Sequence, residues 1–162
     1  MKLYFLVIAT FFVLAAKPQV AGVSLKASGL TCSMCSNAIY KALKTLDFID
    51  AVEADISTYT FAITFKPGTD VDFDKIKKKV ETAGFSVAGF VATVSFNKVL
   101  VDQSGVLNVG NMSFYILNEK PAKLEGTRQI RILNKGFVSL KEYKQYHIPR
   151  ELPAANTFYI II

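Results

Sequence analysis

The stretch VSLKASGLTCSMCSNAIYKAL (residues 23–43) joins a strand pattern to a helix pattern and places two cysteines at the junction. Apolar residues alternate with polar ones over residues 23–27, which predicts a half-buried strand. After the cysteines, Ile39 and Leu43 recur at helical spacing, and Cys35 lies one turn before Ile39. The two cysteines are the only ones in the chain. They are therefore expected on the loop and first turn that open a helix.

The residues that follow, up to Phe96, have the patterns of two strands, a second helix and a last strand. AVEADIS (51–57) and YTFAITF (59–65) both alternate as strands do. Asp72 can cap a second helix whose apolar stripe ends before Gly84, a residue suited to terminating it. FSVAGFVATVSF (85–96) supplies a last strand. The order strand, helix, strand, strand, helix, strand predicts an α+β, ferredoxin-like βαββαβ sandwich, with two helices on one face of a four-stranded antiparallel sheet.

From residue 97 onward the pattern changes to short β-type runs separated by Gly, Asn and Pro. One helix is expected after Ser139, which forms a capping box with Glu142 and is followed by a face of Leu140, Tyr143 and His147. Residues 97–162 are thus predicted to form a small β-rich barrel or sandwich with one helix. Because no flexible linker precedes them, we expect them to pack against residues 23–96.

The N-terminus has the layout of a secretory signal peptide. Lys2 precedes an unbroken apolar run from Leu3 to Ala16, followed by small and polar residues. The run is shorter than the ~20 residues that a membrane-spanning helix needs. We therefore expect residues 1–22 to be a signal peptide cleaved near Ala21, and the protein to be exported to the periplasm or cell envelope. Contact with a membrane is expected only through this segment or through a membrane transporter as partner.

Composition and charge exclude some function classes. The chain of 162 residues is 51% hydrophobic, so it can form a hydrophobic core. Its formal net charge is +6. The basic excess lies in residues 97–162, with nine Lys and Arg against five Asp and Glu. These basic residues are spread along the segment and form no dense run, so we do not expect a nucleic-acid partner.

The chemistry of the cysteine pair points to soft metals. A thiolate at a helix N-terminus faces free backbone N–H groups, which lower its pKa. Two sulfurs without a neighbouring His or carboxylate favour Cu(I) or another thiophilic ion, whereas a structural zinc site needs about four ligands. A disulfide and a redox-active pair stay open at this point, because an exported protein meets oxidising conditions.

The same residues resemble a known family. SGLTCSMCSNAIYKALKTLDFIDAVEADIS (28–57) and FDKIKKKVETAGFSV (73–87) are similar to the heavy-metal-associated domain of copper chaperones, metal-pumping ATPases and the periplasmic mercury-binding protein. That family carries a Gly-Met-Thr-Cys-x-x-Cys motif. The positions that correspond to it or support its loop here are Gly29, Leu30 (in place of Met), Thr31, Cys32, Cys35 and Phe85.

The resemblance implies a metal-binding protein that is not an enzyme. Cys32 and Cys35 would be the metal ligands, Gly29 and Thr31 would shape the loop, and Leu30 and Phe85 would support it. Cu(I) is expected as the ion, with Hg(II) or Zn(II) as alternatives, and a protein donor or acceptor of metal is expected as the partner. A thiol–disulfide oxidoreductase and a protein-interaction module that has lost metal traffic are the competing hypotheses.

Overall fold

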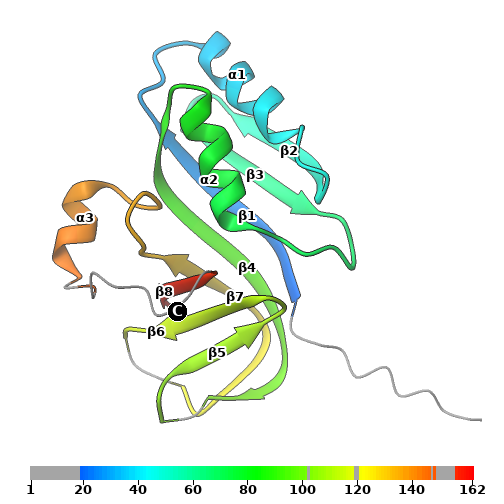
Figure 1. Ribbon diagram of the computed structural model, residues 1–162, viewed down its shortest axis with the longest axis vertical. Helices are drawn as coiled ribbons and strands as arrows, with labels where there is room; N and C mark the ends of the chain where they lie inside the picture. The colour runs from blue at the N-terminus through cyan, green and yellow to red at the C-terminus, as the bar shows by residue number, and fades with distance from the viewer. Residues whose placement is uncertain (1–18, 102, 119–120, 147, 149–155) are drawn as a thin grey trace, which may run out of the picture.

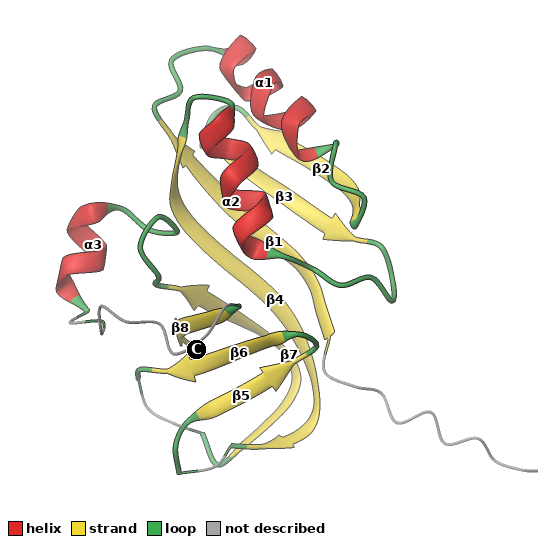
Figure 2. Ribbon diagram, viewed as in Figure 1, coloured by secondary structure: helices red, strands yellow, loops and turns green. Residues whose placement is uncertain are grey.

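The computed structural model describes residues 19–101, 103–118, 121–146, 148 and 156–162. Its first six elements follow the predicted order, and further strands and a helix come after them (Figures 1 and 2). They are β1 (Gln19–Ser28), α1 (Ser33–Leu43), β2 (Ile49–Asp55), β3 (Thr60–Phe65), α2 (Phe73–Thr82), β4 (Ser86–Leu100), β5 (Val106–Val109), β6 (Met112–Ile116), β7 (Lys123–Ile132), α3 (Leu140–Gln145) and β8 (Thr157–Ile161).

The described strands form one eight-stranded sheet in the order β2-β3-β1-β4-β7-β8-β6-β5. Its first four strands pair antiparallel, and α1 and α2 lie side by side on one face of them (Figure 1). This is the ferredoxin-like arrangement that the sequence predicts for the N-terminal part. In the remainder of the sheet, β6 and β8 pair parallel, while the other neighbours are antiparallel.

The predicted boundary between residues 96 and 97 falls inside a strand. β4 runs for 15 residues and pairs with β1 on one side and β7 on the other, so both parts of the chain share it. Residues 97–162 are β-rich and contain one described helix, as predicted. Their strands continue the first sheet, however, where the sequence suggested a separate barrel or sandwich. The reason is the length of β4, which continues its pairing with β7 across the expected boundary, with a shift of register between Phe96 and Val99.

A cluster of phenylalanines joins the two parts. The ring centroid of Phe73 on α2 lies 4.9 Å from that of Phe90 on β4 and 5.3 Å from that of Phe158 on β8. Phe137, in the segment between β7 and α3, lies 5.1 Å from Phe90 in an edge-to-face contact. All four side chains are at most 1% exposed. The molecule therefore has one continuous core, in which α2 packs against residues from both parts.

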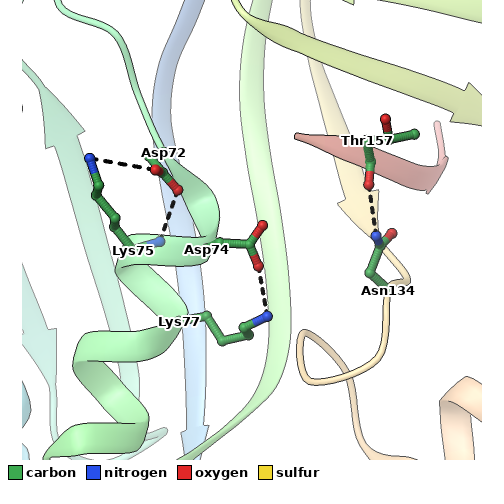
Figure 3. A network of polar contacts seen from close by, with 6 residues as sticks. All are labelled: Asp72, Asp74, Lys75, Lys77, Asn134 and Thr157. Atoms are coloured by element: carbon green, nitrogen blue, oxygen red, sulfur yellow. Dashed lines mark hydrogen bonds and ion pairs between the residues drawn. The ribbon is translucent and has the colours of Figure 1, made fainter. Parts of the chain in front are cut away.

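The helices α1 and α2 form where their apolar spacing predicts, and α2 also has the predicted cap. Ile39 and Leu43 of α1 are fully buried. At the start of α2, the Asp72 carboxylate accepts a hydrogen bond of 2.9 Å from the backbone N–H of Lys75 (Figure 3). Gly84 has φ +91°, a left-handed conformation that ends α2 and that glycine adopts without strain.

The helix α3 begins at the predicted cap and contacts the sheet through an ion pair. Ser139 accepts the predicted cap hydrogen bond from the backbone N–H of Glu142. However, α3 has no buried residue, and Leu140, one of the residues on the predicted face, is 67% exposed. His147 lies outside the described residues. Arg131 on β7 instead donates two hydrogen bonds, of 2.8 and 2.9 Å, to the carboxylate of Glu142.

The last strand, β8, is fixed by a buried amide. Asn134 donates a hydrogen bond of 2.9 Å to the Thr157 carbonyl (Figure 3), and its side-chain oxygen accepts one of 2.7 Å from the Tyr159 N–H. Because a buried amide is costly to leave unpaired, these two bonds hold the register of β8 beside the end of β7.

The structure begins β1 earlier than the predicted end of the signal peptide. Gln19 and Val20 pair with Ser95 and Val94 of β4, and Val20 is 4% exposed. The apolar run of the predicted signal peptide lies in residues 1–18, outside the described part of the chain. Among the residues that are described, no helix is long and apolar enough to cross a membrane.

Candidate metal centre

The two cysteines lie where the chain leaves β1 and enters α1, at the end of the sheet where β4 begins (Figure 1). The Ser28 hydroxyl donates a hydrogen bond of 3.4 Å to the Ser86 carbonyl and ties the base of this loop to β4. Gly29 follows with φ +89°, a left-handed conformation that favours glycine. A Cβ at Gly29 would lie 3.9 Å from the ring of Phe85, so loop and ring are neighbours.

Two apolar side chains support the loop from below. Leu30, which replaces the methionine of the family motif, is 8% exposed and belongs to the core. Phe85 is half-buried and packs against the same core. Thr31 is exposed. Leu30 is thus buried next to the exposed Thr31, and Phe85 lies beside the loop; their supporting roles stay a prediction.

The cysteine side chains face each other at the start of α1. Cys32 is the N-cap residue and is exposed, while Cys35 lies in the first turn and is half-buried against the core. Their Sγ atoms are 3.4 Å apart, and both are free cysteines. The pair is thus brought together without a covalent bond, and its outer member is open to solvent.

The surroundings favour a thiolate at Cys35. The backbone hydrogen bond from Thr31, followed by the hydrogen bond from the Cys32 thiol, lowers the pKa of Cys35 below its usual range. Both donors stabilise the negatively charged sulfur more than the neutral thiol. At a given pH, Cys35 therefore carries more thiolate than a free cysteine, and the thiolate is the form that binds metals.

The ligand set is small and soft. In the described part of the chain, no group of three or more His, Cys, Asp or Glu side chains is placed to hold a metal ion. Met34 lies between the two cysteines but is 79% exposed, as expected of a surface residue. Two sulfurs fit a thiophilic ion of low coordination number and leave its other positions open to a further ligand.

A family comparison agrees with this site. The model of the heavy-metal-associated domain matches residues 24–86, a segment that holds both cysteines, the loop and Phe85. Residues 24–86 are a heavy-metal-associated domain. The domain ends where β4 begins, so most of β4 and all of β5 to β8 lie outside the matched segment.

Known proteins are similar to part of this chain. A probable copper-exporting P-type ATPase of Archaeoglobus fulgidus is 30% identical over 86 residues, which cover 53% of this chain and 11% of that protein. The chain therefore spans about a tenth of the length of this curated relative.

Among solved structures, the yeast copper transporter domain Ccc2a is 31% identical, with 40% of this chain and 88% of that chain covered and a TM-score of 0.37. Oxidized MerP from Ralstonia metallidurans is 28% identical, with 43% and 96% covered and a TM-score of 0.37.

One feature of the heavy-metal-associated domain escaped the sequence reasoning. Ser36, directly after Cys35, is 2% exposed, and its hydroxyl has no hydrogen-bond partner. The sequence signal for this feature is a serine at an apolar position of the α1 stripe, one turn before Ile39 and two turns before Leu43.

Proposed function

We propose that this protein binds one Cu(I) ion between the thiolates of Cys32 and Cys35 and passes it to the thiols of a partner protein. The observation that carries the proposal is the pair of free, facing sulfurs 3.4 Å apart at a solvent-exposed helix start. The lowered pKa of Cys35 supports it, since less free energy is needed to deprotonate the inner ligand.

The choice of copper rests on ligand chemistry. Soft thiolates select Cu(I) over harder ions, and two of them suffice for an ion of low coordination number. Zn(II) in structural sites takes four protein ligands, which the two cysteines do not supply. The name of the curated relative, a copper-exporting ATPase, favours copper over mercury. Hg(II) is the closest alternative, because it is also thiophilic.

The geometry suits transfer better than storage. Cys32 is exposed, so a partner thiolate can reach the ion from solvent and bind it before Cys32 is released. Each exchange replaces one metal–sulfur bond by another, and no electron changes hands. The partner is therefore expected to be a protein that presents its own cysteines, either as donor or as acceptor.

Competition with a Cu(I) chelator tests the proposal under reducing, anaerobic conditions. We expect the wild-type chain to take up one equivalent, and the double variant C32S/C35S to take up none. Met34→Ala is the matched control, because it removes the third sulfur of the segment and leaves both thiolates in place. Equal copper uptake by the wild type and the double variant would refute the proposal.

A thiol–disulfide oxidoreductase is the competing function, because the sulfurs lie close together and one has a lowered pKa. An insulin-reduction assay on the same preparations separates the two. Turnover in that assay together with weak copper binding would favour the oxidoreductase.

We further propose that the protein is exported and that its leader is removed upstream of Gln19. Cleavage near Ala21, as first predicted, would remove Gln19 and Val20, which pair with β4. Mass spectrometry of the protein from the cell envelope tests this: a mature N-terminus between residues 16 and 19 is expected. An intact N-terminus in the cytosol would contradict export.

A further inference from the structure

Ser36 presents an unexplained polar group beside the metal centre. Its side chain is 2% exposed, and its Oγ has no hydrogen-bond partner. Buried hydroxyl groups are nearly always hydrogen-bonded, because an unpaired one keeps its full cost of desolvation. The unpaired hydroxyl lies in the same helical turn as Cys35, so a movement of that turn could bring an acceptor within its reach.

The two sulfurs are closer than a bound ion allows. They are 3.4 Å apart. With metal–sulfur bonds of about 2.3 Å, the sulfurs would be about 3.8 Å apart at a tetrahedral angle and about 4.6 Å apart in line. Metal binding therefore separates them by roughly 0.4 to 1.2 Å relative to this structure. At least one cysteine must move.

Cys32 is the cysteine that is free to move. It is exposed, lies outside α1 and has an extended backbone (φ −156°), whereas Cys35 packs against the core. Its carbonyl accepts a hydrogen bond of 3.1 Å from the N–H of Cys35, three residues on. In α2, the corresponding carbonyl of Asp72 accepts from Ile76, four residues on. The first turn of α1 is thus wound more tightly than that of α2.

We propose that Ser36 is a positioning residue for metal binding, whose hydroxyl donates to the Cys32 carbonyl once Cys32 has moved outward with the ion. Cys32 lies four residues before Ser36, and serine hydroxyls in helices commonly donate to the carbonyl four residues earlier. The bond forms only in the metal-loaded state, so it stabilises that state relative to the metal-free one. This inference rests on the proposed function.

The variant Ser36→Ala tests the inference in the whole chain. Its Cu(I) affinity, measured by chelator competition, is expected to fall about fivefold, as for one neutral hydrogen bond. The melting temperature of the metal-free variant is expected to stay the same or rise, since no bond is lost there. Ser33→Ala is the matched control: Ser33 is an exposed serine in the same turn, and its removal should leave the affinity unchanged.

A second readout follows the acceptor itself. The carbonyl ¹³C chemical shift of Cys32 is expected to agree between wild type and S36A without metal, and to differ between them with Cu(I) bound. Equal affinities and equal shifts in both proteins would overturn the role of Ser36, while wild-type copper binding would leave the proposed function standing. Failure of the wild type to bind copper would refute both.

Discussion

The substitution Phe137→Ala tests whether the heavy-metal-associated domain and the C-terminal strands form one folding unit. Phe137 is 1% exposed and lies outside the matched domain. The centre of its ring is 5.1 Å from that of Phe90 on β4 and 5.6 Å from that of Phe158 on β8, both edge-to-face. The Lys77 ammonium of α2 lies 4.7 Å from the centre of the same ring. Truncation to alanine therefore removes contacts with both parts at once.

The expected loss follows from these contacts. Truncation of a buried phenylalanine costs about 3–5 kcal/mol, including the cavity that it leaves. The contact with the partly exposed Lys77 adds roughly 0.5 kcal/mol. A total near 4 kcal/mol is a large share of the 5–15 kcal/mol by which domains are typically stable. At about 2–4 °C per kcal/mol for a chain of this size, the melting temperature should fall by about 8–16 °C.

Urea denaturation with two probes measures this loss. Circular dichroism reports on the whole sheet, and the reactivity of the cysteine thiols reports on the heavy-metal-associated domain. We expect both probes to give one transition with the same midpoint in the wild type, and the same shift of that midpoint in F137A. Leu140→Ala is the control, since that side chain is 67% exposed and should change stability by less than about 0.5 kcal/mol. Separate midpoints, or a loss in F137A below about 1 kcal/mol, would refute a shared core.

Three further predictions concern the site and α3. The variant Cys32→Ser keeps the Thr31 backbone donor. The alkylation rate of its Cys35 should rise with pH around a midpoint below that of a free cysteine, because the lowered pKa keeps the thiolate at lower pH. A midpoint at or above that of a free cysteine would contradict the assigned cause. The substitution Gly29→Ala should destabilise the protein by about 1–2 kcal/mol in thermal melts, because a φ of +89° is strained for alanine. A steric clash adds nothing, since no atom lies closer than 3.9 Å to the new Cβ. An unchanged melting temperature would show that the loop adapts. A double-mutant cycle on Arg131 and Glu142 should give a coupling free energy of at most about 1 kcal/mol, since the ion pair is bidentate but partly exposed. A clearly larger value would mean that the ion pair is shielded from solvent.

Local patterns in the sequence predicted the N-terminal part well. The alternation in residues 59–65 correctly assigned Phe61, Ile63 and Phe65 to the core. Asp72 and Gly84 mark the start and end of α2 as expected, because caps depend on a few neighbouring residues only. The motif around Cys32 also located the candidate site, since two cysteines three residues apart at a helix start meet by helix geometry alone.

The failures concern contacts between residues distant in the chain. The capping box of α3 was correct, but the sequence did not predict that Leu140 stays exposed, because burial depends on what packs against the helix. The β-type runs after residue 97 were recognised, yet nothing local indicates that β8 inserts between β6 and β7. Strand order is set by pairing across long sequence separations, which periodicity does not report.

By itself, the sequence determined the order of the first six elements and the proximity of the Cys32 and Cys35 sulfurs, because both follow from contacts within one or two turns or strands. Only the tertiary structure decided that β4 is shared by both parts and that α2 packs in a common core. It also decided that the Ser36 hydroxyl is buried without a partner. These three features depend on how separate segments enclose one another, and such burial exists only once those segments have met.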